Sequence, residues 1–340
     1  VAAGRKAWTV DFGRDYLCCG TDQGNILVWK INENGQPHSL LWQGQPSKRP
    51  ASITTGPFGC GRVNSIKCSG DWIVSGGDDK TAIVWNIKSW SRQAILRGHQ
   101  SSITSVSILK LNPSTTASSS PSSSSSSSSL GQPIAINTSM IVATASRDGD
   151  IRVYHLSSHT KSQITSTLHL GTLVDAHPGG VSSIELYEGD EGSTPILLSG
   201  GVDEKLRQWD LRSFLVGLWD AEETISMGRK IYNRRNSSCL WGFGGELQSI
   251  SISNDGRIAA SFGKTIFHSS VPIKASGLYC SDDDTSSARI FTINTMSEWT
   301  VMKGHSGVIR CIAFSPDSKT LASASCDGTI RLWSVKEAHV

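Results

Sequence analysis

The chain has 340 residues, of which 37% are hydrophobic and 18% charged, and its formal net charge is +3. This length and apolar content suffice for a large core, and so small a net charge does not by itself indicate nucleic-acid binding. The eight cysteines form no C-x-x-C pair, which argues against a zinc site and is typical of a reducing compartment. Because we find neither a signal peptide nor an apolar run of membrane-spanning length, we expect a cytoplasmic or nuclear protein with no membrane partner.

Short runs of alternating apolar and polar residues, typical of half-buried strands, begin near the N-terminus. The first set of four lies within residues 7–45. Its runs are Ala7–Phe12, Tyr16–Gly20, Asn25–Ile31 and Ser39–Trp42. A segment rich in Pro, Gly and Thr, residues 46–61, then predicts a loop before the next set begins at Arg62.

Later sets share a polar pattern with fixed spacing. The second set carries Ser75, Asp79 and Trp85, so the hydroxyl, the carboxylate and the aromatic residue are four and then six positions apart. The same spacing recurs as Thr144, Asp148 and Tyr154, as Ser199, Asp203 and Trp209, and as Ser323, Asp327 and Trp333. A histidine precedes each of these three later sets, at His99, His177 and His305. Self-similarity of this kind is the signature of a repeat architecture.

The third repeat contains an insertion. His99 and Tyr154 are 55 positions apart, whereas His305 and Trp333 are 28 apart. The surplus falls at residues 113–138, where Pro113–Leu130 is rich in serine. Such a segment has little apolar surface to bury, so we expect it to be disordered, between the first and second strands of its repeat.

Residues 213–287 diverge from the pattern, and two alignments of this region compete. In one, Leu240–Ile252 aligns with Leu96–Ile108, and Gly263 and Ser269 replace the Asp and Trp of a decayed repeat. In the other, four strands between Thr265 and His305 form a compact repeat, and residues 214–263 supply a further divergent one.

The last repeat, residues 304–333, is the clearest. Its three alternating runs are Val308–Phe314, Thr320–Ser325 and Thr329–Trp333; a Gly-His pair opens it and a Trp closes it. This stretch resembles one blade of a WD40 β-propeller, and the earlier sets repeat it. The resemblance implies an all-β fold in which residues 1–340 form a single propeller domain.

The resemblance also implies that the polar residues of each repeat form buried structural networks, in which the imidazole links the carboxylate to the hydroxyl and the indole N–H bonds the hydroxyl. The implied members are His99, Thr144, Asp148, Tyr154, His177, Ser199, Asp203, Trp209, His305, Ser323, Asp327 and Trp333. A catalytic triad is the competing interpretation of a Ser, a His and an Asp. Their repetition along the chain and the Trp partner favour the structural role.

Length favours seven blades, with six as the alternative. Without the insertion, seven blades have about 45 residues each and six about 52, against roughly 40–45 for a WD40 unit. Because the last repeat has three runs, we expect Val1–Gly4 to complete it as an outer strand and so close the ring.

The absence of any P-loop, nucleophile elbow or H-E-x-x-H motif argues against an enzyme, and no cofactor or small-molecule substrate is expected. We instead expect a scaffold that binds a partner protein across one face of the propeller. Residues at strand starts and before the turn aspartates should line that face: Lys6, Arg62, Asp78, Gln100, Arg147, Val202, Arg310 and Cys326. The arginines among them favour an acidic or phosphorylated peptide.

One alternative function is a substrate receptor of a cullin-RING ubiquitin ligase. Trp209-Asp210-Leu211-Arg212 resembles the box with which such receptors dock their adaptor, and Arg212 would be its key residue. Trp-Asp-Leu-Arg is also an ordinary end for a WD40 strand. A basic cluster within residues 229–235 is interpreted as a solvated loop.

Overall fold

The structure is a computed structural model of the chain. It describes residues 7–12, 16–31, 37–44, 61–111, 138–158, 163–188, 195–219, 230–232, 238–242, 246–253, 257–263, 286–292, 298–315, 318–327 and 329–334.

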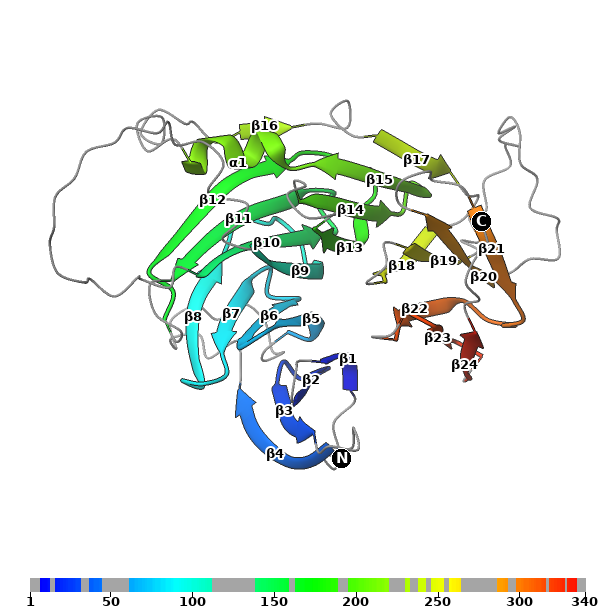
Figure 1. Cartoon of the computed structure of the whole chain (residues 1–340), viewed down its shortest axis with the longest axis horizontal. Coiled ribbons are helices and arrows are strands. Elements are labelled where there is room, and N and C mark those ends of the chain that lie inside the picture. Colours follow the sequence, from blue (N-terminus) through cyan, green and yellow to red (C-terminus); the bar gives the residue numbers. More distant parts are fainter. Residues whose placement is uncertain are drawn as a thin grey trace, which may run out of the picture.

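The described strands form six sheets, numbered here in chain order, arranged one after another around a common centre (Figure 1). Sheet 1 contains β1 (Ala7–Phe12), β2 (Tyr16–Thr21), β3 (Ile26–Ile31) and β4 (Pro37–Gly44), and sheet 2 contains β5 (Val63–Ser69), β6 (Trp72–Gly77), β7 (Ala82–Asn86) and β8 (Ser91–Leu96). Sheet 3 contains β9 (Ile103–Leu111), β10 (Thr138–Ser146), β11 (Ile151–Ser158) and β12 (Ser166–Leu173). Sheet 4 begins with β13 (Val181–Tyr187), β14 (Ile196–Gly201) and β15 (Lys205–Asp210). Sheet 5 contains β18 (Glu246–Ile252), β19 (Arg257–Gly263), β20 (Ser286–Thr292) and β21 (Glu298–Lys303), and sheet 6 contains β22 (Ile309–Phe314), β23 (Thr320–Ser325) and β24 (Ile330–Ser334).

The first strand of each sheet is its inner edge. Strands β1, β5, β9, β13, β18 and β22 contact one another in that order and surround the centre of the molecule (Figure 1). The expected strands of the first and last repeats are confirmed to within two residues. The chain thus has the predicted all-β propeller-like architecture.

The outer strand of sheet 4 is separated from the other three strands by a long segment of sequence. After β15 the chain forms α1 (Arg212–Trp219), and β16 (Lys230–Tyr232) then pairs in parallel with β12 of sheet 3. Only afterwards does β17 (Ser238–Gly242) pair with β15 and complete sheet 4. This excursion explains part of the length that separates the fourth repeat from the next.

The long connection from β15 through α1 and β16 to β17 also affects the number of blades. Residues 246–303 supply one sheet, whose first strand β18 lies where the first alignment of the divergent region placed it. Its last two strands, β20 and β21, correspond to runs of the second alignment. The described residues therefore form six sheets, and the count of seven is not confirmed. Residues 211–237 and 264–285 add length to the sequence without adding a described sheet, so an equal division of the length does not decide the number of blades.

Two other expectations concern segments outside the described residues. The serine-rich segment lies between β9 and β10, which pair directly, with Leu111 opposite Ser139. Its disorder stays a prediction, as does the pairing of Val1–Gly4 with the last sheet.

Candidate functional site

Sheets 4 and 6 each bury a complete polar network. The Trp209 indole N–H donates to Ser199 Oγ over 2.8 Å, and that oxygen lies 2.7 Å from His177 Nε2. His177 Nδ1 lies 2.6 Å from Asp203 Oδ1. In sheet 6 the Trp333 indole N–H donates to Ser323 Oγ over 2.8 Å, and that oxygen lies 2.7 Å from His305 Nε2. His305 Nδ1 lies 2.8 Å from Asp327 Oδ2. The geometry is that implied by the resemblance.

Arg207 adds a partner that the sequence pattern did not reveal. Its guanidinium donates to Asp203 Oδ2 over 2.7 Å and to the carbonyl of Ala176 over 2.9 Å. Burial alone would raise the pKa of Asp203, but the hydrogen bonds from His177 and Arg207 hold it below its usual range. Burial dominates at His177 and lowers its pKa, so the imidazole is neutral beside an ionised carboxylate. Because Ser199 and His177 are fully buried, this constellation holds the fold rather than presenting a nucleophile.

Sheet 3 has a variant of the network. His99 Nε2 lies 2.9 Å from Thr144 Oγ1, and His99 Nδ1 lies 3.1 Å from Asp148 Oδ2. Tyr154 occupies the Trp position, and its hydroxyl donates to the carbonyl of Arg97 over 3.1 Å. The phenol is therefore anchored to the main chain at the start of its own repeat.

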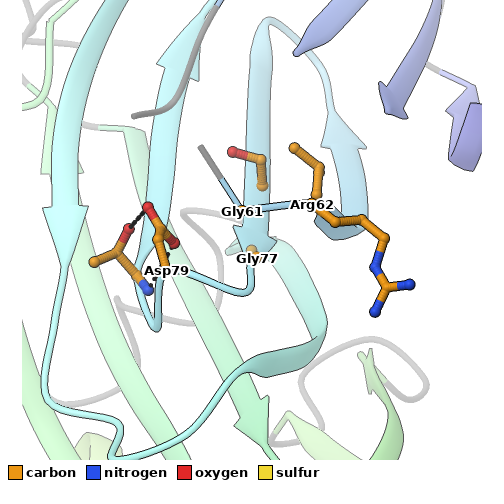
Figure 2. A pocket seen from close by; sticks show the side chains of 8 residues that line it. Gly61, Arg62, Gly77 and Asp79 are labelled. Carbon is orange, nitrogen blue, oxygen red and sulfur yellow. Dashed lines mark hydrogen bonds between the residues drawn. The ribbon is translucent and has the colours of Figure 1, made fainter. Parts of the chain in front are cut away.

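Sheet 2 lacks the histidine. Trp85 donates to Ser75 over 3.0 Å, while Asp79 accepts from the amide and the hydroxyl of Thr81. A cavity of about 10 Å³ is lined by residues that include Ser75, and Figure 2 labels Gly61, Gly77 and Asp79 around it. Its size and the polar groups of Ser75, Asp79 and Thr81 in its lining suit one water molecule. The Arg62 side chain extends away from Asp79, toward the centre of the molecule (Figure 2).

The centre contains a much larger cavity of about 900 Å³. Each of the six inner strands has a β-bulge at the same point of its pairing with the second strand. The bulged residues all line this cavity: Trp8, Asn64, Thr104, Ser182, Gln248 and Arg310. A bulge re-aims one side chain without ending the strand, so six bulges at one level create a ring of polar and aromatic groups.

Three arginines give the cavity its charge. Arg62, Arg147 and Arg310 line it, and Glu246 is the acidic residue among the described lining residues. Arg62 lies over the Trp8 ring, 4.1 Å from its centroid, and its Nε donates to Asn64 Oδ1 over 2.8 Å. Arg310 Nη1 donates to Gln248 Oε1 over 2.7 Å. These contacts orient two guanidinium groups along the wall.

Arg147 reaches the cavity from the turn after β10. Its amide donates to the carbonyl of Ser102, and its side chain is exposed. The turn packs closely on Gly180, where an added Cβ would lie 3.3 Å from the Cα of Arg147. Gly180 also has a φ of 122°, which glycine adopts without strain. The glycine thus permits the approach that brings Arg147 to the cavity.

An ion pair spans the centre deeper in the molecule. Lys67 Nζ lies 2.8 Å from Glu185 Oε2, although β5 and β13 are separated by β9 in the ring. Burial would lower the pKa of Lys67, but the Glu185 and Asp11 carboxylates together raise it. Burial also raises the pKa of Glu185. Each partner lies three residues beyond a cavity-lining bulge residue of its own strand.

Most of the residues expected to bind a partner come together here. Arg62, Arg147, Val202, Arg310 and Cys326 line the cavity. Asp78 lies beside it, with Oδ2 3.7 Å from Arg62 Nε. Gln100 is not among the lining residues; its side chain donates to the carbonyl of Gly98. Lys6 is outside the described residues.

The sequence pattern missed five of the six bulge residues. A bulge interrupts the period-2 alternation by one residue, so residues such as Asn64 and Thr104 looked like ordinary polar positions of a strand. The register of their strand pairs alone reveals them.

Arg212 lies apart from this cavity, at the start of α1. Its side chain is exposed, and its guanidinium pairs with Asp210, with an Nη2–Oδ2 distance of 2.8 Å. The basic cluster expected near residues 229–235 falls mostly outside the described residues.

Within the part of the chain that the structure describes, no group of three or more His, Cys, Asp or Glu side chains is arranged to hold a metal ion. No described helix has the length and apolar character needed to cross a bilayer.

Comparison with known proteins gives consistent results. The sequence profile of the family "WD domain, G-beta repeat" matches residues 50–86, 90–155 and 297–334. A chain in a solved structure titled "Crystal Structure of Mitotic Checkpoint Complex" aligns over 99% of this chain and 77% of its own length, with a TM-score of 0.59 and 12% identity. At that identity the likeness shows the fold alone.

Several curated relatives match parts of the sequence. The Serine-threonine kinase receptor-associated protein of Gallus gallus is 27% identical over 199 residues, which cover 46% of this chain and 56% of that protein. Its Dictyostelium discoideum counterpart is 50% identical over 44 residues, or 13% of this chain and 15% of that protein. Human Apoptotic protease-activating factor 1 is 26% identical over 147 residues, which cover 42% of this chain and 12% of that protein. The matches thus span about half of the chicken relative and much less of the other two. The three matched segments are WD40 repeats, and the fold and the buried networks resemble those of that repeat family.

Proposed function

We propose that this chain is a non-catalytic scaffold that binds an acidic or phosphorylated segment of a partner protein in the central cavity. The observation that carries the proposal is the convergence of Arg62, Arg147 and Arg310 on one cavity of about 900 Å³. Proteins built from WD40 repeats typically serve as interaction scaffolds. The comparisons agree with this role, because one relative is named for its association with a receptor and the similar fold belongs to a multiprotein complex.

The chemistry of the lining favours an anion. Guanidinium groups bind carboxylates and phosphates through paired, charge-assisted hydrogen bonds. The described lining residues include three arginines and one glutamate, so the cavity attracts a negatively charged segment more strongly than a neutral one. Asn64, Thr104 and Gln248 add neutral hydrogen-bonding groups that can fix its orientation.

The position of the cavity favours insertion from one side. The turns that carry Arg147, Val202 and Cys326 line it, whereas the Lys67–Glu185 ion pair lies further along β5 and β13. A loop or chain end that enters on the side of these turns meets the arginines first. We place this scaffold in the cytoplasm or nucleus, in keeping with the free thiols at Cys18, Cys19 and Cys68.

Peptide titration tests the proposal. A fluorescent acidic peptide containing phosphoserine should bind the wild-type chain saturably, and its affinity should fall as salt is raised. A peptide of the same length with lysine in place of each acidic residue should not bind. Equal affinity for both peptides, or binding of neither, would refute the proposed ligand class.

A substrate receptor of a ubiquitin ligase is the alternative function. Arg212 is exposed and so accessible to an adaptor, but its ion pair with Asp210 is equally expected at an ordinary strand end. Co-purification of the adaptor with the wild-type chain, and its loss with Arg212→Ala, would favour the receptor. Absence of the adaptor from the wild-type preparation would remove it.

A further inference from the structure

Two cysteines from different sheets meet at the junction between sheets 1 and 2. Cys18 on β2 is fully buried, whereas Cys68, the next-to-last residue of β5, is half-buried. Cys18 belongs to the apolar cluster that fills this junction, and Cys68 packs against the same cluster. The fold therefore brings together two thiols that are far apart in the sequence.

Contacts on both sides of Cys18 fix how β2 lies along β5. Tyr16, two residues before this cysteine, donates its hydroxyl to the carbonyl of Gly70, which follows the second cysteine by two residues. On the other side, Gly20 lies so close to the Val63 side chain that an added Cβ would overlap it. Side chains alternate between the two faces of a strand, so Tyr16 and Cys18 project from the same face, toward sheet 2.

Asp11 on β1 provides a third point of alignment. It pairs directly opposite Cys18, so the two side chains project from the same face of sheet 1. Its Oδ2 accepts a hydrogen bond from the main-chain N–H of Cys68 over 2.7 Å. The main chain at Cys68 therefore lies against the face that carries the Cys18 thiol. A hydrogen bond between the two thiols, together with burial, raises the pKa of Cys68 well above its usual range.

We propose that Cys18 and Cys68 form a reversible disulfide bond when the protein meets hydrogen peroxide, and that this bond links sheet 1 to sheet 2. The Cys68 thiolate attacks one peroxide oxygen, which breaks the O–O bond, forms a sulfenic acid and releases hydroxide. The Cys18 sulfur then attacks the Cys68 sulfur and expels the sulfenic oxygen as water. Overall, the peroxide takes two electrons from the sulfurs, and the two thiol protons end in two molecules of water.

The difference in exposure gives the two sulfurs different roles. Cys68 is the partly exposed thiol and reacts with the small oxidant first, whereas the buried Cys18 acts on the sulfur that already lies beside it. The raised pKa of Cys68 leaves little thiolate at neutral pH, so its oxidation is slow there and accelerates as pH rises.

The bond joins the two sheets whose Trp8 and Arg62 side chains are in contact at the wall of the central cavity. It therefore restrains the relative position of two lining residues without changing either of them. Disulfide bonds in the cytoplasm or nucleus are characteristically transient, so this bond is a switch rather than a permanent link. Its formation does not depend on what the cavity binds.

Peptide mapping of the purified chain tests the proposal. After peroxide treatment the remaining thiols are blocked with N-ethylmaleimide, and a tryptic digest is analysed by mass spectrometry. The wild-type chain should give a pair of peptides linked through Cys18 and Cys68, and dithiothreitol should separate them. Each increase of one pH unit should speed formation of the link by up to about tenfold, because the thiolate fraction rises tenfold per unit below the pKa.

Cys19 offers a matched control, because it is the adjacent buried cysteine on β2 and projects from the opposite face. Cys19→Ala should keep the link, whereas Cys18→Ala and Cys68→Ala should each abolish it. A wild-type chain without the linked pair, or with Cys68 oxidised only to sulfinic acid, would overturn the proposal. A link to Cys68 that persists in Cys18→Ala, or that disappears in Cys19→Ala, would overturn it as well.

Discussion

Ser199 is the residue on which the network of sheet 4 depends. Its hydroxyl serves His177 and Trp209 at once, at 2.7 and 2.8 Å, and all three side chains are buried. Ser75 occupies the equivalent position in sheet 2 and accepts a hydrogen bond from the Trp85 indole. Within the described residues, no histidine bonds Ser75. The pair offers a comparison of a complete and an incomplete network within one protein.

We predict that Ser199→Ala lowers the free energy of unfolding by about 1–3 kcal/mol, because it leaves a buried imidazole and a buried indole N–H without a partner. Ser75→Ala should cost less, since one such group is affected beside a cavity that suits a water molecule. Urea denaturation of the two variants measures the difference. Equal losses would show that the histidine contributes nothing to the network.

His177 and Asp203 predict a pH dependence of stability. Burial lowers the pKa of His177 below its usual value of 6.5 in the folded chain, so the unfolded chain takes up a proton first as pH falls. The stabilisation from neutral His177 is therefore present above pH 6.5 and declines below it. The depressed pKa of Asp203 adds a loss at lower pH, when that carboxylate is protonated.

Thermal melts between neutral and mildly acidic pH measure this effect. The melting temperature should fall below pH 6.5 in the wild type, and His177→Gln should reduce that dependence. A His177→Gln variant with the same pH profile as the wild type would assign the dependence to other groups.

At the scale of elements, the connection between β9 and β10 allows a direct test. The strands pair from Ile103 to Leu111 without help from the serine-rich segment. Shortening a flexible loop changes its closure cost by only about 0.6 kcal/mol for each halving of length. We therefore predict that deletion of Pro113–Leu130 leaves the melting temperature and peptide binding almost unchanged. A large drop in melting temperature would show that the segment packs against the folded chain.

Elements could be predicted where the repeat is regular and not where it is interrupted. The alternation in Ala7–Phe12 and in Thr320–Ser325 predicted strands that the structure confirms, and in the second of them Leu321 and Ser323 are buried. Helix α1 and strand β16 were missed, since they belong to an excursion that leaves sheet 4 before β17 completes it. Pairing between segments so far apart in sequence leaves no local signal.

The candidate site shows the same division. Arg147, Val202 and Cys326 were expected at the rim because each precedes a turn aspartate, and the turn fixes their position. The ring of bulge residues was not expected, because a one-residue shift in strand register cannot be recognised from alternation alone. The cavity residues that turns position could therefore be predicted, whereas those that strand register positions required the structure.

At the scale of the whole molecule, the sheets act as a frame that holds groups from six inner strands around one cavity. No single repeat contains the site; Arg62, Arg147 and Arg310 come from sheets 2, 3 and 6. Loss of one sheet would therefore disperse the arginines even if the others stayed folded. This dependence makes binding at the cavity a sensitive measure of the intact arrangement.

The affinity of the fluorescent phosphoserine peptide for two charge-reversal variants tests the central claim most directly. Arg147→Glu changes an exposed cavity residue, while Arg212→Glu makes the same charge change outside the cavity. Arg147→Glu should weaken binding by more than about tenfold, because it removes a charge-assisted hydrogen bond worth roughly 1.5–3 kcal/mol and adds repulsion. Arg212→Glu should bind like the wild type. Equal losses in the two variants, or none in Arg147→Glu, would contradict binding at the arginine-lined cavity.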